Sequence, residues 1–192
     1  MPPAPRATPC SVRETPRSPS ENRMRNIEFK SELRDLRAAR AIALVVGARL
    51  ERVLEQRDEY VAVPEGRLKR RTERDLAGGE PRTEWIWYLR ADSVLSRTSL
   101  WTRLDDAQVA VRWPDLDRTV RGVIVKTREL WTLGSVRIHF DSVSGLGDFF
   151  ELEGVCGPGD EPTRLRHEVE ALVAHFRSAL GEPIGTSYAE MA

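Results

Sequence analysis

The stretch DFFELEGV, residues 148–155, alternates between apolar and charged side chains over Phe150–Glu153. Phe150 and Leu152 fall on one face of an extended chain, and Glu151 and Glu153 fall on the other. This period of two is typical of a β-strand. Because both central positions of the polar face carry a carboxylate, the stretch predicts a strand with one apolar face and one acidic face.

Other segments repeat this pattern, and turn residues such as Glu65-Gly66, Gly78-Gly79 and Gly145–Gly147 separate several of them. Short alternating segments bounded by glycine-rich turns predict antiparallel strands. Together with residues 148–155 they make eight strands. The other seven are Arg25–Lys30, Val53–Val63, Arg67–Arg71, Glu84–Arg90, Ser96–Arg103, Val120–Arg128 and Val136–Asp141.

Helical patterns interrupt the strands. Asp35 can cap a helix over Leu36–Val46 that Gly47 ends. A short helix is expected between residues 105 and 116, where Pro114 interrupts it. The clearest helix begins at Pro162, is closed by Gly181, and carries one broad apolar stripe that must pack against a sheet. The stripe consists of Leu165, Val169, Leu172, Val173, Phe176 and Leu180.

The composition excludes several classes of protein. The 192 residues carry 30 Lys and Arg against 30 Asp and Glu, so no overall charge attracts the chain to nucleic acid or to an anionic membrane. No apolar run approaches the ~20 residues of a membrane-spanning helix. Cys10 and Cys156 are the two cysteines, which argues against a disulfide framework. We expect a soluble, cytoplasmic protein.

Residues 1–23 are rich in Pro, Ser and Arg and almost lack large apolar side chains. Such a segment buries too little surface to offset its ordering entropy, so we expect a disordered tail followed by one domain over residues 24–192. Translation starting at Met24 is an alternative explanation of the tail.

The polar faces of the predicted strands carry charge at nearly every position. A solvated sheet surface explains any one strand, but the whole set has eight basic and four acidic side chains, an excess of four positive charges. If the sheet closes into a barrel with helices outside, these charges line the interior. The basic residues are Lys30, Arg67, Lys69, Arg71, Arg90, Lys126, Arg128 and Arg137; the acidic residues are Glu28, Asp141, Glu151 and Glu153.

A charged interior needs water or a polyanion, because each unpaired buried charge costs several kcal/mol. A triphosphate, with about four negative charges, would balance the excess. The four carboxylates would repel it unless a divalent metal lies between them, and Mg²⁺ or Mn²⁺ prefers carboxylate oxygens.

The order of these motifs resembles the CYTH superfamily, also called triphosphate tunnel enzymes, in its bacterial branch similar to class IV adenylyl cyclases. The resemblance covers about residues 25–190. It begins with Ile27-Glu28-Phe29-Lys30, which resembles the family's E-x-E-x-K signature. It continues through Gly66-Arg67-Leu68-Lys69, Trp87-Tyr88-Leu89-Arg90, Arg97 with Ser99, Val125-Lys126-Thr127-Arg128, residues 136–141 and 145–153, and Thr186-Ser187-Tyr188.

The resemblance implies an α+β fold: a closed, antiparallel, eight-stranded β-barrel with helices packed outside. It implies Mg²⁺ or Mn²⁺ as cofactor, held by Glu28, Glu151 and Glu153 with Asp141 as a further candidate. It also implies that the eight basic residues bind phosphate and that Glu28, Lys30 and Glu153 are catalytic. The first Glu of the signature is Asn26 here, which brings no charge to a metal site.

Three functions follow from the resemblance. The leading hypothesis is a metal-dependent phosphohydrolase acting on tripolyphosphate or on a nucleoside or thiamine triphosphate. One alternative is an adenylyl cyclase that converts ATP to cyclic AMP and pyrophosphate. Asn26 motivates the other, a non-catalytic binder of triphosphate or polyphosphate. The partner in each case is a small molecule, and the sequence leaves a homodimer open.

Some side chains have a second interpretation. His139 is expected to be a wall residue bonded to a neighbour, with proton transfer as the alternative. The tryptophans could stack on a base, but packing beneath the outer helices is expected for most of them.

Overall fold

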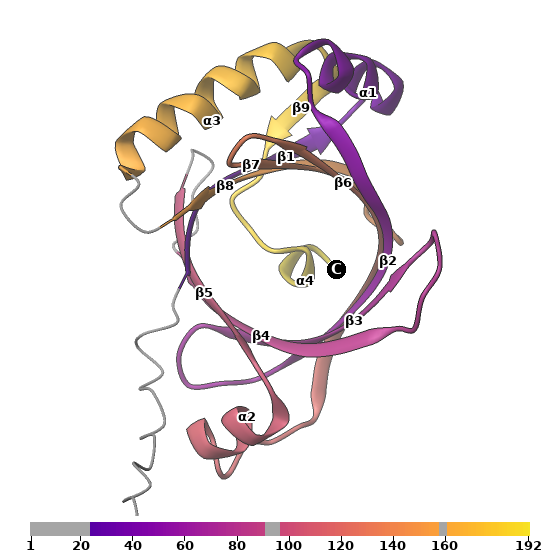
Figure 1. Ribbon diagram of the computed structural model, residues 1–192. Helices are drawn as coiled ribbons and strands as arrows, with labels where there is room; N and C mark the ends of the chain where they lie inside the picture. Colours follow the sequence, from indigo (N-terminus) through magenta and orange to yellow (C-terminus); the bar gives the residue numbers. More distant parts are fainter. Residues whose placement is uncertain (1–23, 91–96, 158–160) are drawn as a thin grey trace, which may run out of the picture.

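The computed structural model describes residues 24–90, 97–157 and 161–192 as a closed β-barrel with helices around it (Figure 1). Eight antiparallel strands follow one another in the order β5-β4-β3-β2-β6-β7-β8-β1. The barrel closes because β1 pairs with β8 on one side and with β5 on the other. The predicted α+β barrel is therefore confirmed, while the tail predicted over residues 1–23 lies outside the described part of the chain.

Every predicted strand is present, and several are longer than the sequence pattern suggested. The bounds are β1 Met24–Leu33, β2 Arg49–Val61, β3 Arg67–Asp75, β4 Arg82–Arg90, β5 Arg97–Leu104, β6 Val120–Leu133, β7 Val136–Val143 and β8 Gly147–Cys156. The extensions have a common cause, because backbone pairing between neighbours continues past the alternating segment. Arg49, for example, pairs with Thr132 at the ends of β2 and β6.

Two predicted helices form close to their expected bounds. Helix α1 covers Leu36–Val45, and the Asp35 side chain accepts a hydrogen bond from the Ala38 backbone N–H at its start. Helix α2 covers Asp106–Arg112 and ends before Pro114, which cannot continue a helical hydrogen-bond ladder.

The last long helix, α3, covers Pro162–Phe176 and is shorter than predicted. A 3₁₀ turn at Arg177–Ala179 follows it, and then strand β9, Leu180–Pro183, pairs with β1. The prediction that Gly181 closes the helix is therefore wrong. Gly181 lies so close to the side chains of Glu32 and Arg34 that a β-carbon there would collide with them.

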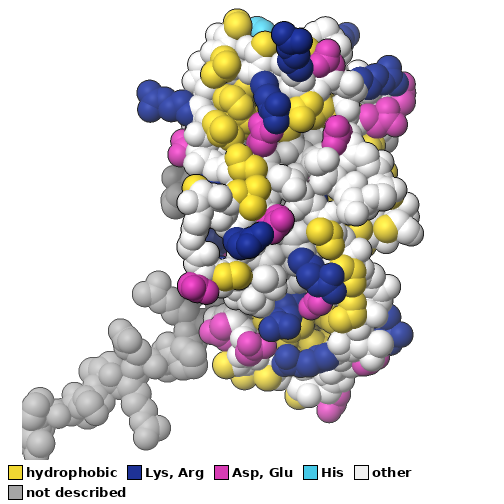
Figure 2. Space-filling view, turned by 90° about the vertical axis from the view of Figure 1, so that its right-hand side faces the viewer, with side chains coloured by type: hydrophobic (Ala, Val, Ile, Leu, Met, Phe, Trp, Pro, Cys, Tyr) yellow, Lys and Arg dark blue, Asp and Glu magenta, His cyan; other side chains and the backbone are white. Residues whose placement is uncertain are grey.

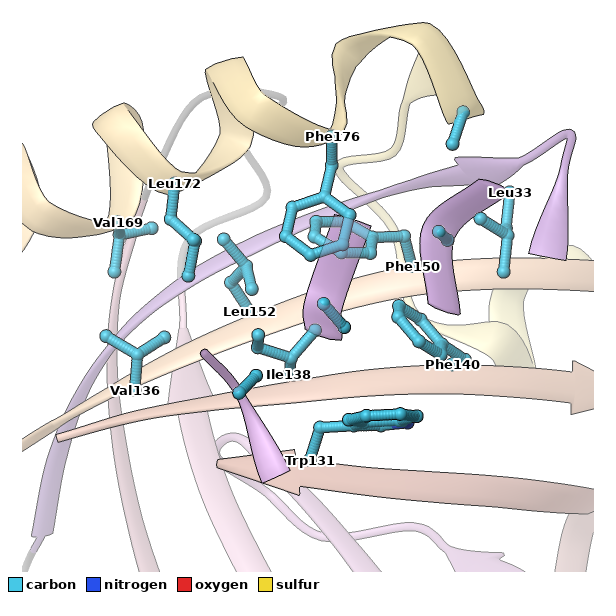
Figure 3. Close-up of a cluster of buried hydrophobic side chains, with 14 of the residues drawn as sticks. Leu33, Trp131, Val136, Ile138, Phe140, Phe150, Leu152, Val169, Leu172 and Phe176 are labelled. Atoms are coloured by element: carbon cyan, nitrogen blue, oxygen red, sulfur yellow. The ribbon is translucent and has the colours of Figure 1, made fainter. Parts of the chain in front are cut away.

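The main hydrophobic core lies between the barrel and helices α1 and α3 (Figure 3). The apolar faces of β1, β7 and β8 point outward into this core, as the alternation predicted. Phe176 from α3 is fully buried there, with its ring centroid 4.8 Å from that of Phe150 and 6.2 Å from that of Phe140. Helix α2 covers a second cluster around Trp87 and Leu68.

One helix departs from the prediction that all helices pack outside. Helix α4, Tyr188–Met191, lies within the circle of strands (Figure 1). Tyr188 joins Ile124, Val143 and Phe149 in a buried apolar cluster that includes strand positions on the inner face. We call these four residues the end cluster, because its strand members lie near the ends of β6, β7 and β8.

The outer side of β2 and β3 has no covering helix in Figure 1, and Figure 2 shows basic and acidic side chains side by side over this face. These charges pair across the strands, as in the contact of Arg74 with Glu55 at 2.6 Å. None of the helices in the described ranges is long and apolar enough to cross a bilayer.

We predict that Phe176→Ala lowers the free energy of unfolding by about 3–5 kcal/mol, because it removes a buried ring from the contact between α3 and the barrel. Urea unfolding followed by circular dichroism measures the change. The exposed neighbour His175 offers a control, since His175→Ala should cost no more than about 0.5 kcal/mol. Equal stability of the two variants would contradict this account of the core.

Candidate functional site

The interior of the barrel is a cavity of about 510 Å³ lined by side chains from all eight strands. Its volume lies within the range of about 300–1,000 Å³ that is usual for small-molecule sites. The structure places nine of the residues singled out from the sequence around this cavity. They are Glu28, Lys30, Lys69, Arg71, Lys126, Arg128, Arg137, Glu151 and Glu153.

A buried carboxylate that the sequence analysis missed holds two of the cations in position. Asp58 on β2 lies opposite Arg71 in the register of β2 and β3. It accepts hydrogen bonds from Arg71 Nε at 2.6 Å, from Arg71 Nη2 at 2.7 Å and from Lys69 Nζ at 2.8 Å. Its own exposure is 1%.

The protonation of this cluster follows from its burial. Burial opposes the ionisation of Asp58, but Arg71 and Lys69 outweigh it and hold the pKa of Asp58 far below its usual value. Burial, helped by the charge of Arg71, lowers the pKa of Lys69 to about 7. The Asp58 carboxylate is therefore charged at neutral pH, while Lys69 is close to its titration point.

Asp141 on β7 forms an equivalent cluster with Lys126 and Arg128 on β6. It accepts hydrogen bonds from Lys126 Nζ at 2.8 Å, from Arg128 Nε and Nη2 at 2.6 Å, and from the Tyr188 hydroxyl at 3.0 Å. These donors occupy both carboxylate oxygens. The structure therefore gives no support to Asp141 as a metal ligand, and we assign it to holding the two cations.

The structure does not bring two other predicted phosphate ligands to the described cavity wall, for different reasons. Arg67 does not line the cavity; its Nη2 lies 2.6 Å from Glu190 Oε1 on helix α4, so it fixes the C-terminal segment inside the barrel. Its side chain contacts a carboxylate because α4 enters the barrel, which the sequence analysis did not foresee. Arg90 lies on β4, and its side chain is outside the described part of the structure.

The acidic residues meet on the wall formed by β7 and β8. Ligand atoms of His139, Glu151 and Glu153 lie within 4.8 Å of one another, which is compact enough for one divalent ion. Glu28 on β1 lies opposite Glu153 in the strand register but is not part of this group. Asn26 lines the same cavity with an exposure of 2%, and its side-chain oxygen is buried without a hydrogen-bond partner.

The charge balance differs from the sequence-based estimate. Among the described side chains, eight Lys or Arg line the cavity; five Glu line it, and Asp58 and Asp141 contact four of the cations. The excess is one positive charge, not four. Arg52, Arg103, Glu51, Glu73 and Asp58 were missing from the first estimate, because alternation alone does not show which face of a strand with charges on both sides points inward.

Trp101 does not pack beneath an outer helix, as was expected for most of the tryptophans. It lines the cavity from β5, opposite Tyr88 of β4, and its indole nitrogen is buried without a hydrogen-bond partner. Trp85 and Trp87 belong to the cluster beneath α2, and Trp131 belongs to the main core, as predicted.

A closed antiparallel barrel whose interior combines paired cations with a compact acidic group defines a class of proteins with an internal polar chamber. The chain belongs to the CYTH domain family, whose model matches residues 24–178.

Solved structures share this fold. A protein from Pyrococcus horikoshii OT3 is 20% identical, with a TM-score of 0.61, over 86% of this chain and 97% of that one. A proposed adenylate cyclase from Vibrio parahaemolyticus is 18% identical, with a TM-score of 0.58, over 86% and 96% of the two chains. At these identities the likeness concerns the fold alone. Comparison with curated proteins finds no match.

We predict that Asp58→Asn lowers the free energy of unfolding by about 3–5 kcal/mol, because it leaves Lys69 and Arg71 buried without their counter-ion. Chemical unfolding measures the loss. Glu59→Gln is a matched control on the outer face of the same strand, where the pairs with Arg57 and Arg70 should contribute about 1 kcal/mol or less. If Asp58→Asn is as stable as the control, the inference that Asp58 holds Lys69 and Arg71 in position is wrong.

Proposed function

We propose that the protein is a divalent-metal-dependent phosphohydrolase that acts on a triphosphate substrate inside the barrel. The observation that carries this proposal is the pair of buried clusters, in which Asp58 and Asp141 each fix a lysine and an arginine at the cavity wall. Cations fixed in advance need little reorganisation when a polyanion binds, which favours electrostatic stabilisation of phosphoryl transfer.

The cations would bind different oxygens along the phosphate chain. Arg71 and Arg128 present planar guanidinium groups suited to two phosphate oxygens at once, and Lys69 and Lys126 act as point charges beside them. Lys30, whose Nζ lies 3.8 Å from Glu151 Oε1, would bind a phosphate oxygen near the acidic group. Arg137, 3.7 Å from Glu153 Oε2, would do so from the other side.

The acidic group fits a divalent metal ion. Glu151 and Glu153 would hold it, and Glu28 would orient a water molecule or complete the coordination from the neighbouring strand. When bound, Mg²⁺ or Mn²⁺ would supply charge neutralisation of the phosphate oxygens. The charge balance supports this requirement, since one excess positive charge among the described residues cannot neutralise a triphosphate.

We predict that the purified protein releases orthophosphate from tripolyphosphate, ATP or thiamine triphosphate in the presence of Mg²⁺ or Mn²⁺. Glu153→Gln should reduce turnover about 100-fold or more, because it removes charge from the metal site. Asp148→Asn, at an exposed position of the same strand, should leave turnover unchanged. Binding of tripolyphosphate without metal-stimulated turnover of any of the three substrates would favour a non-catalytic binder.

An adenylyl cyclase is the second candidate, and Trp101 is the observation that favours it. Trp101 lines the cavity, its buried indole N–H has no partner among the described residues, and the Arg103 guanidinium lies 5.3 Å from the ring centroid; a nucleobase could accept the indole hydrogen bond beside this cation. The products separate the two reactions. Cyclic AMP and pyrophosphate from ATP would identify the cyclase, and orthophosphate would identify the hydrolase.

We predict that metal-free binding of tripolyphosphate weakens about tenfold between pH 6 and pH 8 through Lys69. Its pKa of about 7 means that the side chain is protonated below this pH and neutral above it, so a charge that attracts phosphate is lost as the pH rises. Lys69→Arg stays protonated and should remove this part of the pH dependence. Isothermal titration calorimetry on both proteins measures it, and identical pH profiles would contradict the assignment.

A further inference from the structure

His139 lies in an unusual position for a histidine inside a barrel. It is on the inner face of β7, directly opposite Glu151 of β8, and its exposure is 2%. Its Nδ1 is buried and makes no hydrogen bond of good geometry; the nearest carboxylate oxygen of its ion pair, Glu151 Oε2, is 3.5 Å away. A buried polar atom without a good hydrogen bond destabilises the fold, so the structure retains a site there that a ligand would satisfy.

The unsatisfied nitrogen points into the acidic group. His139 Nδ1 lies 3.5 Å from Glu151 Oε2, and the ligand atoms of these two residues and Glu153 lie within 4.8 Å of one another. Ligands of one metal ion lie about 3–4 Å apart when the bonds are about 2.1 Å long. Small side-chain rotations would therefore bring all three groups onto one ion.

The contact between His139 and Glu151 has two interpretations: a hydrogen bond between the two side chains, or a shared metal ion. Glu151 Oε2 already accepts a hydrogen bond from Arg128 Nη2 at 2.7 Å, so its charge is partly compensated without His139. Within the described part of the chain, Glu151 Oε1 forms one ion pair, a loose contact of 3.8 Å with Lys30 Nζ, which leaves it suited to a metal ion. The two interpretations differ in what they predict for metal binding.

We propose that His139 is a nitrogen ligand of the metal site, together with Glu151 and Glu153, and that the site consequently prefers Mn²⁺, Co²⁺ or Zn²⁺ over Mg²⁺. This inference rests on the proposed metal dependence of the cavity and adds the identity of a ligand and the class of metal. Mg²⁺ favours all-oxygen sites, whereas imidazole suits the later first-row metals, whose affinities rise along the Irving–Williams series.

Asn26, on the strand β1 that pairs with β8, strengthens the inference. Its side-chain oxygen is buried, unpartnered and uncharged, where the family signature has a carboxylate. The site therefore has fewer anionic oxygens to offer a hard ion such as Mg²⁺. A nitrogen ligand would compensate for this loss only with a metal that binds imidazole well.

Metal binding in the absence of any phosphate tests the proposal separately from catalysis. The full chain, freed of metal with a chelator, is titrated with Co²⁺ while its visible absorption is recorded, and with Mg²⁺ by calorimetry. We expect the wild-type protein to bind Co²⁺ at least about 10-fold more tightly than Mg²⁺. His139→Gln should lose about 10–100-fold in Co²⁺ affinity and change little in Mg²⁺ affinity.

The chain provides its own controls. His167 and His175, the other two histidines, are exposed on α3, so His167→Ala and His175→Ala should bind Co²⁺ as the wild type does. Unchanged tripolyphosphate binding without metal shows that His139→Gln keeps the cavity intact. Equal Co²⁺ affinities of wild type and His139→Gln, or an equal loss for both metals, would overturn the proposal.

A measurement on the wild-type protein removes any dependence on the folding of the variant. Pulsed electron paramagnetic resonance of the Mn²⁺-loaded protein should show hyperfine coupling to one histidine nitrogen, which ¹⁵N labelling of histidine shifts. Absence of this coupling overturns the proposal. Coupling in a protein that hydrolyses no triphosphate would support the ligand assignment while rejecting the proposed function.

Discussion

A carboxylate buried between a lysine and an arginine occurs twice in this barrel, and the open interior depends on it. Asp58 lies across from Arg71, and Asp141 lies across from Arg128, in the register of neighbouring strands. The lysine of each cluster is two residues from the arginine and therefore on the same face. Without these counter-ions, four buried cations would repel one another at a cost of several kcal/mol each. With them, the cavity can exist without a ligand and still present cations to one.

The C-terminal segment completes this arrangement. Tyr188 donates its hydroxyl hydrogen to Asp141 of β7 and places its ring 4.0 Å from Lys30 Nζ of β1, so it contacts both a carboxylate and a cation of the cavity wall. Glu190 holds the segment through Arg67 and through the capping box with Ser187. Strand β9 orders the chain just before this segment by pairing with β1. The interior therefore depends on residues at both ends of the domain.

Local periodicity was enough to predict the strands, the outer helices and most cavity residues, because alternation is a property of each strand alone. It failed where a contact joins distant segments. Nothing local indicates that Arg67 meets Glu190, or that Gly181 belongs to a strand paired with β1. Asp58 was missed for another reason, since Glu55, Arg57 and Glu59 make the outer face of β2 more charged than the inner one. The inward-facing positions of β2 could have been identified from Gln56 and Tyr60. Both are uncharged, and they lie two positions before and after Asp58.

The end cluster and the unpartnered indole of Trp101 distinguish the two ends of the lumen. Lys30 lies beside Tyr188 of the end cluster, whereas Trp101 pairs in register with Met24, six residues earlier on β1. Six residues of strand span about 20 Å, so Lys30 lies far along β1 from the position paired with Trp101, whose ring instead has the Arg103 guanidinium 5.3 Å from its centroid. Under the proposed function, a triphosphate that binds with its phosphates near Lys30 would place any organic group toward Trp101. Inorganic and organic triphosphates would then bind in one orientation, and the residues around Trp101, not the two Asp–Lys–Arg clusters, would discriminate between them.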